Sequence, residues 1–245
     1  MFLKLKNIKN GTHWLWEITS MLLNGKAEHI DTVKEKFELE FLPQSAYNSI
    51  SSPRVLNSHL YFKQLPTDTI NKQCKIVYID RNPKDVAVSF YNHHKKITVY
   101  QYDGKWENYC YRFMRGLVDF GSWFDYVKNW ENVIKQEKDY PVHLINYEDL
   151  KENGFEEVKK LAKFLGVEED IQLFKSIYEV CQFDNLKKKK DEIEELDYWK
   201  NSTPGMYRKG IAGDWKNWFT VKQNEDFNQI YEDKMKDSNT KYQNF

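Results

Sequence analysis

The sequence contains few cysteines and no excess charge of either sign, and both features narrow the class of protein. Its 245 residues include three cysteines, Cys74, Cys110 and Cys181, which are widely spaced and follow no metal-ligand pattern. An odd, scattered set argues against a disulfide framework and suits a reducing compartment. Lys plus Arg and Asp plus Glu both number 37. Proteins that bind nucleic-acid phosphates usually carry a basic excess, so nucleic acid is disfavoured as a partner.

Long apolar runs are also missing from the chain. No stretch of about 18 apolar residues occurs, so we expect no membrane span and no membrane partner. The first residues, MFLKLK, are interrupted by lysines and lack the apolar centre of a signal peptide. Together with the cysteine usage, these features predict a cytoplasmic protein.

The chain does contain alternating strand and helix patterns. Hydrophobic residues make up 40% of it and aromatic residues 16%, which is enough for a sizeable core. The patterns predict strands at residues 2–6, 54–60 and 74–80, and a fourth in VHLIN that runs into a loop at NYEDL. They predict helices at residues 14–23, 85–91 and 155–165. This alternation predicts an α/β fold with a central parallel sheet flanked by helices, and residues 1–245 form one predicted domain because no linker or repeat occurs.

Residues 187–190 are four consecutive lysines, followed by an acidic stretch that ends at Glu195. Segregated charge of this kind is typical of a solvated helix face or a mobile loop. We therefore predict that the segment lies at the surface without a specific role.

A candidate anion site lies between the first strand and the first helix. Lys9 contributes a cation, Gly11 allows a close approach of the backbone, and Thr12 contributes a hydroxyl. The N–H groups and the positive end of the following helix favour a phosphate or sulfate. The K-N-G-T stretch alone is equally consistent with an ordinary helix-capping turn. The nucleotide-binding pattern G-x-x-x-x-G-K-[ST] is absent.

Two further groups could bind a second phosphate. Arg81 follows the predicted buried strand, at the end where open α/β sheets bind ligands, and Ser89 lies about two helical turns later. A guanidinium and a hydroxyl in these places suit a phosphate. Arg208, Lys209 and Gly210 place two cations and a bare backbone N–H in one turn.

Several longer motifs, taken together, resemble the cytosolic sulfotransferases, which use 3′-phosphoadenosine 5′-phosphosulfate (PAPS) as sulfuryl donor. They occur in the family order between about residue 7 and about residue 230. The motifs are KNGTHW, RVLNSHLYFKQLP, VYIDRNPKDVAVSFY, FMRGLVDFGSWFDYV, NYEDLKENGFEEVKKLAKFLG and RKGIAGDWKNWFTVKQNEDF. The resemblance implies a single α/β domain whose cofactor-binding parts are similar to those of nucleotide kinases.

The resemblance also implies which residues bind PAPS. The 5′-phosphosulfate is bound by Lys9, Asn10, Gly11, Thr12 and His13. The 3′-phosphate is bound by Arg81, Ser89, Arg208, Lys209 and Gly210. The adenine is contacted by Trp14, Tyr147, Cys181 and Phe183.

The same resemblance implies the reaction: sulfuryl transfer to a hydroxyl or amine of a small, aromatic or lipophilic acceptor. His59 matches the catalytic base, and a neutral imidazole suits that role because its pKa lies near working pH. Lys9 and the surrounding N–H groups would neutralise the leaving oxygen in one in-line step, without a metal. The other histidines are read as structural, although the first of them also lies within the cradle: His13, His29, His93, His94 and His143.

A short segment matches the dimerisation motif of the family and predicts a homodimer. Its key residues are Lys216, Thr220, Val221 and Glu225, and Lys216 would pair with Glu225 across a two-fold axis. The alternative is an exposed segment of a monomer.

The chain departs from the family pattern near the cradle and the base. Where relatives have Tyr-Pro, Ser and a second Thr, it has Asn7-Ile8, Asn10 and His13. A lysine two residues before the base is replaced by Asn57. The chain also begins closer to the cradle than its relatives do, so part of the acceptor-pocket wall is expected to be short.

Two alternatives to an active sulfotransferase stay open. The first is a homologue that binds PAPS or its product PAP with weak or lost transfer, and the second is a protein similar to nucleotide kinases, which the missing phosphate-loop pattern disfavours. Several aromatic residues either line the acceptor pocket or belong to the core: Trp16, the aromatic run at 106–113, and Tyr198-Trp199.

Overall fold

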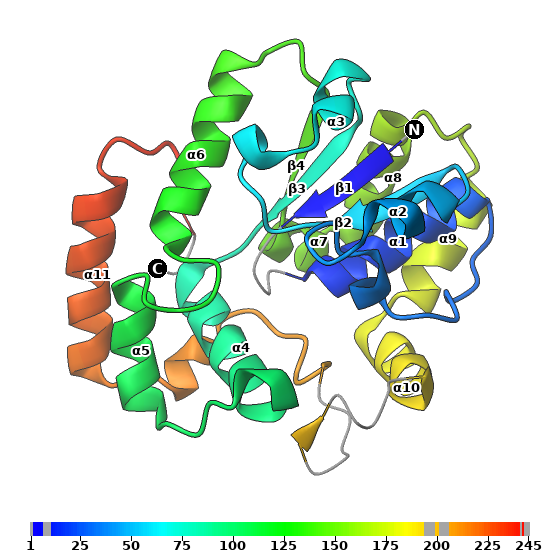
Figure 1. Cartoon of the computed structure of the whole chain (residues 1–245). Coiled ribbons are helices and arrows are strands. Elements are labelled where there is room, and N and C mark those ends of the chain that lie inside the picture. Colours follow the sequence, from blue (N-terminus) through cyan, green and yellow to red (C-terminus); the bar gives the residue numbers. More distant parts are fainter. Residues whose placement is uncertain (1, 7–10, 194–198, 201–205, 241, 243–245) are drawn as a thin grey trace.

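The computed structural model describes residues 2–6, 11–193, 199–200, 206–240 and 242. Within them, four parallel strands form a sheet in the order β2-β1-β3-β4 (Figure 1). The strands are β1 (Phe2–Lys6), β2 (Arg54–Asn57), β3 (Ile76–Asp80) and β4 (Val142–Asn146). The chain passes from β1 to β2 on one side and reaches β3 on the other. The carboxyl ends of β1 and β3 therefore form the switch point at which such sheets bind ligands.

Strand β3 is buried on both faces, as its continuous apolar sequence predicts. Val77 and Ile79 belong to the core formed with α1 (Thr12–Asn24), α8 (Gly154–Leu165) and α9 (Ile171–Val180). Ile76 and Tyr78 belong to the opposite core, formed with α6 (Trp123–Gln136). Successive side chains of a strand point to opposite faces, so this one strand separates the two helical layers.

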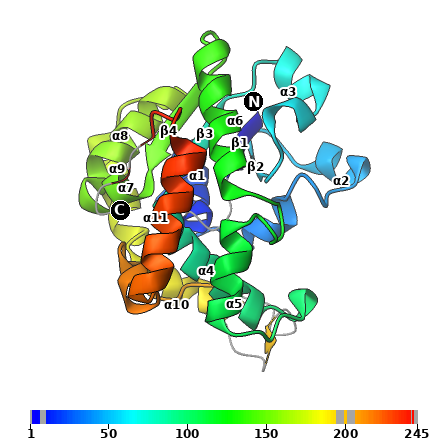
Figure 2. The same ribbon diagram turned by 90° about the vertical axis from the view of Figure 1, so that its left-hand side faces the viewer.

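A third core lies on the side of α6 away from α1. It is built from α4 (Pro83–Lys96), α5 (Trp106–Met114) and α11 (Val221–Met235) together with α6. Figures 1 and 2 show α11, α5 and α6 grouped on one side of the molecule, with α1, α8 and α9 on the other. No helix in the described part of the chain is long and apolar enough to cross a membrane.

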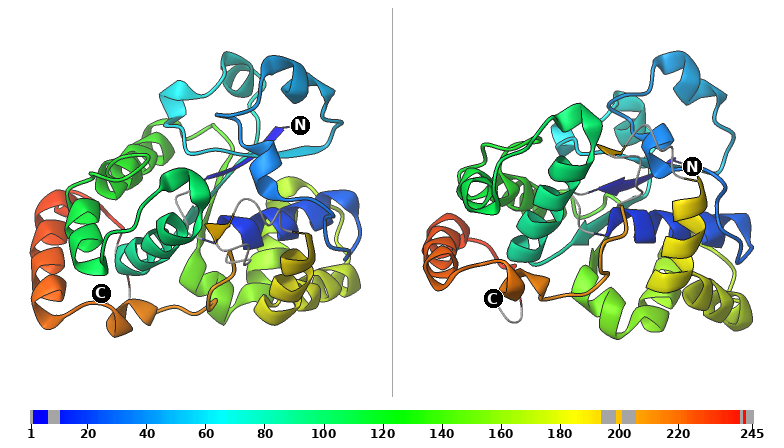
Figure 3. Two further views of the ribbon diagram at one scale, coloured as in Figure 1. Left: turned by 60° about the horizontal axis from the view of Figure 1, so that its bottom comes forward. Right: turned by 90° about the horizontal axis from the view of Figure 1, so that it is seen from below.

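Shorter elements complete the described structure. The remaining helices are α2 (Gln44–Ser49), α3 (Thr67–Asn71), α7 (Tyr147–Glu152) and α10 (Phe183–Ile193). Short 3-10 helices are η1 (Lys34–Phe37), η2 (Phe62–Gln64), η3 (Thr98–Tyr100) and η6 (Asp214–Asn217). In Figure 3 the segment that leads to η6, drawn in orange, passes between α4 and the group of α7 and α10.

The predicted fold class is confirmed, and two predicted elements are corrected. The segment after β4 is the helix α7 and not a loop, because the side chain of Asn146 accepts hydrogen bonds from Glu148 N (2.9 Å) and Asp149 N (3.2 Å). The predicted strand at 54–60 ends at Asn57, since the hydroxyl of Ser58 bonds Glu40 (2.7 Å) and caps Leu60 N (3.1 Å).

The lysine-rich segment is also not the purely solvated surface that its charge pattern predicts. It forms part of α10, and Lys190 is 4% exposed. Its ammonium pairs with the buried carboxylate of Glu17 in α1 and donates to the carbonyl oxygens of Ile30 (2.6 Å) and Thr32 (3.0 Å). Helical spacing puts Lys190 on the same inner face as Leu186, so one lysine of the four fastens α10 to α1.

Candidate active site

The cradle between β1 and α1 depends on Gly11. Its φ is 99°, and a Cβ atom there would lie 2.5 Å from Cδ2 of Tyr147. A glycine therefore lets the chain turn against the Tyr147 ring and enter α1 without a clash. Thr12, His13 and Trp14 form the first turn of that helix. The predicted residues Lys9 and Asn10 lie outside the described residues.

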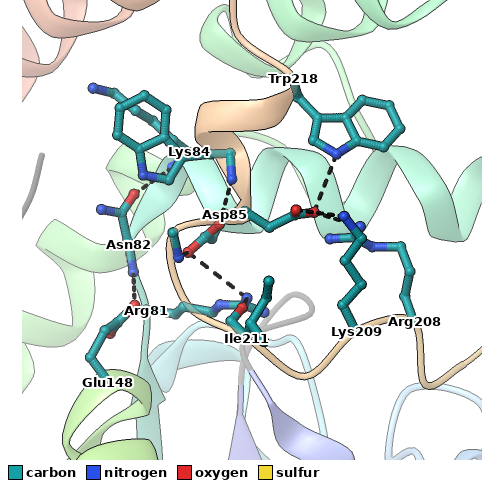
Figure 4. Close-up of polar contacts among 12 residues, drawn as sticks. Arg81, Asn82, Lys84, Asp85, Glu148, Arg208, Lys209, Ile211 and Trp218 are labelled. Carbon is teal, nitrogen blue, oxygen red and sulfur yellow. Dashed lines mark hydrogen bonds and ion pairs between the residues drawn. The ribbon is translucent and has the colours of Figure 1, made fainter.

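Arg81 is placed by the end of β3 and lies against the same tyrosine. Its guanidinium carbon is 4.1 Å from the centre of the Tyr147 ring, and its Nη2 donates to the carbonyl of Ile211 at 3.2 Å (Figure 4). The side chain of Asn82 then accepts from Lys84 N at 3.0 Å and begins α4. The strand end thus holds Arg81 in place before the helix that carries Ser89.

Arg208 and Lys209 reach the site from the last third of the chain. Nη1 of Arg208 lies 2.5 Å from one carboxylate oxygen of Asp214, and Nζ of Lys209 lies 2.7 Å from the other (Figure 4). Burial raises the pKa of Asp214, but hydrogen bonds from Lys209, Asn217 and Arg208 outweigh it and lower the pKa to about 2. Asp214 is therefore an ionised carboxylate that pairs with both cations.

Asp85 fastens this segment to α4. Its carboxylate accepts from the backbone N–H groups of Gly213 (2.6 Å) and Trp215 (3.0 Å). Asp85 lies one turn after Arg81, so a single helix start fixes both the arginine and the segment that carries the other cations. Sequence reasoning missed both acidic residues, although each follows a predicted cation within six positions.

Every predicted cofactor-binding residue within the described part lines one cavity at the carboxyl ends of β1 and β3. These residues are Gly11, Thr12, His13, Trp14, Arg81, Ser89, Tyr147, Cys181, Phe183, Arg208, Lys209 and Gly210. Residues that sequence reasoning missed also line it: Lys151, Leu186, Met206, Tyr207 and Ile211. The ammonium of Lys151 lies 5.3 Å from the Trp14 ring centre. Recognising α7 as a helix would have found Lys151, one turn after Tyr147.

Phe183 and Cys181 contribute to the cavity in different ways. Gly210 has a φ of 66°, and a Cβ atom there would overlap the Phe183 ring, so the bare backbone of Gly210 makes room for that ring. The Cys181 thiol is fully buried, 3.6 Å from the sulfur of Met21. Burial raises the pKa of this thiol, so it is protonated and part of the cavity wall.

A second cavity, of about 290 Å³, contains His59 and shares Thr12 and His13 with the first. The His59 ring stacks on Phe120, with centres 4.1 Å apart. Aromatic and aliphatic side chains of Phe41, Phe90, Val99 and Tyr100 line the rest, together with His93 and the polar residues of η1. His13 and His93, read as structural from the sequence, thus line this cavity.

Lys34 of η1 lies beside Asn57, the position at which the family pattern has a lysine. Lys34 is buried, and its Nζ donates to the side-chain oxygen of Asn57 and to Glu38, both at 3.1 Å. The Asn57 amide in turn donates to the Lys34 carbonyl at 2.7 Å. Burial lowers the pKa of Lys34, but Glu35 and Glu38 outweigh it and raise the pKa, so the cation is retained.

The aromatic residues considered for the acceptor pocket separate into two groups. Trp106, Tyr109 and Phe113 are buried in the core of α4, α5 and α11 and line neither cavity. Trp16 and Trp199 line a third cavity beside His13, Lys34 and Glu35. Tyr198 lies outside the described residues.

A cationic cavity at the switch point of a parallel sheet, adjoining a cavity that contains a histidine, is an arrangement that suits a group-transfer enzyme with an anionic co-substrate. Residues 8–239 match the sulfotransferase domain family. Mouse sulfotransferase 1 family member D1 is 35% identical over 96% of this chain and 83% of the relative, and dog sulfotransferase 1B1 is 37% identical over 93% and 80%. The chain belongs to the sulfotransferase family, and the prediction of a sulfotransferase is confirmed.

Solved structures agree with this assignment. Mouse sulfotransferase SULT7A1, solved in complex with PAP, aligns over 97% of this chain and 84% of its own, with a TM-score of 0.77 and 29% identity. Retinol dehydratase, solved with androsterone and PAP, aligns over 100% of this chain and 82% of its own, with a TM-score of 0.83. The two sequences are 19% identical, so this comparison shows similarity of fold alone.

Proposed function

We propose that the protein transfers the sulfuryl group of PAPS to a hydroxyl or amine of a small, aromatic or lipophilic acceptor. The observation that carries the proposal is the junction of two cavities at Thr12 and His13. One cavity gathers the cationic and aromatic residues, and the other contains the candidate base, His59. A donor and an acceptor in these two spaces would meet at the start of α1, where a group can pass between them.

The residues of the first cavity fit a doubly charged adenine nucleotide. We assign the 5′-phosphosulfate to the cradle of Lys9, Asn10, Gly11, Thr12 and His13. We assign the 3′-phosphate to Arg81, Ser89, Arg208, Lys209 and Gly210. We assign the adenine to the space beside Trp14, Tyr147, Cys181 and Phe183. Support comes from the cavity that those of them within the described residues share, from the glycine-dependent approach at Gly11 and Gly210, and from the PAP in the solved SULT7A1 structure.

In the proposed reaction the hydroxyl oxygen or amine nitrogen of the acceptor attacks the sulfuryl sulfur, and His59 accepts the proton that this group loses. PAPS supplies the sulfuryl group and the phosphate that leaves. Lys9 and the N–H groups at the start of α1 neutralise charge on the departing phosphate oxygen. The chain positions the reactants and forms no covalent intermediate.

The second cavity favours a compact acceptor. Its volume of about 290 Å³ and its walls of Phe41, Phe90, Tyr100 and Phe120 suit a molecule of one or two rings. Retinol dehydratase, which has the same fold, was solved with androsterone and with retinol, which are small and lipophilic. We extend that general class, and no single compound, to this chain.

A homologue that binds PAPS or PAP with weak transfer is the second candidate. It is favoured by Asn57, whose amide is occupied by Lys34, and by the changed cradle residues Asn7, Ile8, Asn10 and His13. Under this alternative, PAP binds tightly while every acceptor is a poor substrate.

Calorimetry with PAP and a transfer assay with labelled PAPS separate the two candidates. For the proposed function we expect PAP binding and transfer to at least one of a panel of phenols, alcohols and amines. Lys9→Ala should reduce kcat by about 10²-fold or more, and His59→Asn by about 10²- to 10⁴-fold. His143→Asn is a matched control, because His143 stacks on Phe164 away from both cavities. Full turnover by His59→Asn would remove His59 from the mechanism.

We further propose that residues 1–245 form one domain that acts in the cytoplasm as a homodimer. The motif residues Lys216, Thr220, Val221 and Glu225 are all exposed, and Val221 is 75% exposed. An exposed apolar residue at the start of α11 suits a two-fold contact. Analytical ultracentrifugation of the wild type and Val221→Glu tests it: a dimer that becomes a monomer supports the proposal, and a monomeric wild type contradicts it.

A further inference from the structure

A buried carboxylate lies beside the candidate base. Glu40 follows η1, and its side chain is 12% exposed. Oε1 accepts hydrogen bonds from the backbone N–H of His59 and from the hydroxyl of Ser58 at 2.7 Å. Oε2 is buried and has no hydrogen-bond partner among the residues that the structure describes. A buried carboxylate oxygen without a partner is costly and calls for an explanation beyond local structure.

The carboxylate also approaches the His59 ring. Oε1 lies 3.8 Å from Nδ1, while Phe120 stacks on the face of the imidazole at 4.1 Å. The Glu40 carboxylate therefore lies near the Nδ1 atom of the ring, and the stacked Phe120 ring restricts the tilt of the imidazole. A carboxylate 3.8 Å from Nδ1 favours the proton of a neutral imidazole on Nδ1, which leaves the lone pair of Nε2 for the acceptor.

Other ionisable groups also face the cavity of His59. They are His13 from α1, Lys34 and Glu35 from η1, Glu38 directly after η1, His93 from α4 and Tyr100 from η3. Lys34 lies 3.1 Å from Glu38 and 3.5 Å from Glu35, and His13 lies 2.7 Å from Glu35. Lys34, Glu35, Glu38 and His13 therefore have ion-pair partners among themselves. Glu40 differs because its contacts are with His59 and with the residue before it.

We propose that Glu40 is a positioning residue for the base, an inference that rests on the proposed role of His59. It keeps the proton of neutral His59 on Nδ1 and stabilises the imidazolium that forms during transfer. In that step the acceptor O–H bond breaks, the proton moves to Nε2, and the acceptor oxygen forms a bond to sulfur. The bond between sulfur and the leaving phosphate oxygen breaks, and that oxygen keeps the electron pair.

Glu40→Gln tests this role because it removes the charge and keeps a side-chain oxygen for Ser58 and the His59 N–H. NMR titration of 15N-labelled histidines, assigned with His59→Asn, measures the pKa and the tautomer of His59. We expect its pKa to fall by about 1 pH unit or more and the share of Nδ1-protonated tautomer to drop. The acid limb of kcat/KM should move to lower pH by the same amount. The value of kcat should fall about tenfold or more while the Kd for PAP changes less than twofold.

Glu131→Gln is the matched control. Glu131 in α6 likewise accepts from a hydroxyl, that of Ser238 (2.6 Å), and from a backbone N–H, that of Thr240 (2.9 Å), but it lines neither cavity. It should leave the His59 titration unchanged. If Glu40→Gln fails to fold, Glu40→Asp keeps the charge and withdraws it from the ring, and should lower the His59 pKa by a smaller amount.

An unchanged pKa and tautomer of His59 in a folded Glu40 variant would overturn the inference, as would an equal shift in Glu131→Gln. The titration needs no turnover, so the two proposals fail separately. A wild type that transfers sulfuryl to no acceptor contradicts the proposed function, whereas an unaltered titration contradicts the role of Glu40.

Discussion

Replacing Lys190 by methionine should destabilise the protein strongly. The Lys190 side chain is 5% exposed and that of its partner Glu17 is 1% exposed, so Lys190→Met leaves a carboxylate buried without its cation. Removing one member of a buried pair typically costs about 3–5 kcal/mol. Methionine retains the aliphatic stem, which limits the loss of packing near Trp16. We therefore expect the free energy of unfolding to fall by about 4 kcal/mol at pH 7.

The loss of unfolding free energy in Lys190→Met should be larger at pH 7 than at pH 4. Burial already raises the pKa of Glu17 in the wild type, with Lys190 opposing it, so loss of Lys190 raises that pKa further. A folded-state pKa above the unfolded value means that stability is lost as pH rises above about 4, the ordinary pKa of Glu. The deficit of Lys190→Met should therefore shrink toward pH 4. The double variant Glu17→Gln/Lys190→Met should recover most of the loss at pH 7.

Urea unfolding followed by tryptophan fluorescence, together with calorimetry for PAP, measures these effects. Because α10 also carries Phe183 and Leu186 of the cofactor cavity, PAP binding should weaken in Lys190→Met. Lys187→Met is the control: Lys187 pairs with Asp191 in the same helix, both side chains are partly exposed, and the substitution should cost less than about 1 kcal/mol. The reasoning would be refuted if Lys190→Met lost less unfolding free energy than Lys187→Met. It would also be refuted if Glu17→Gln/Lys190→Met were no more stable than Lys190→Met.

Two further predictions concern the strand end and the cofactor cavity. Burial raises the pKa of Asp80 to about 7 against hydrogen bonds from Tyr242 and from the Arg81 N–H, so the titration of Asp80 should lower stability by about 3 kcal/mol between pH 4 and pH 7. Asp80→Asn should lack this slope in urea unfolding, and equal slopes would contradict the prediction. Gly210→Ala should displace Phe183 and weaken PAP binding at least tenfold in calorimetry. Gly25→Ala, at a similar φ with open space around it, should cost about 1–2 kcal/mol of stability and leave the affinity intact.

The sheet and its main helices were predictable because their patterns are local. The continuous apolar run before Arg81 specifies a strand buried on both faces, and Gly25 and Gly166 end their helices in left-handed conformations. The gathering of Arg81 and Ser89 with the 208–210 segment followed from the family resemblance and from the rule that ligands bind at strand ends. Whether these residues bind PAPS stays a prediction.

The contacts that fix those residues were not predictable from one sequence. Lys34 reaches Asn57 across 23 positions, and Lys190 reaches Glu17 across 173, distances over which no periodic pattern carries information. A run of lysines in a sequence predicts a solvent-exposed segment. Lys190 is buried because it pairs with Glu17, and the sequence around Lys190 gives no sign of that distant carboxylate. Asp85 and Asp214 were missed for the same reason: the backbone and cations that they hold become neighbours only after folding.

The first turn of α1 is a wall common to the two cavities, and this has a consequence for how such a protein can change. A substitution at Thr12 or His13 changes the lining of both cavities together. Phe41 and Val99 line only the histidine cavity, and each is 70% exposed. Under the proposed function, substitutions at these two positions can therefore change which acceptor is used, while the first turn of α1 keeps its contacts with the donor.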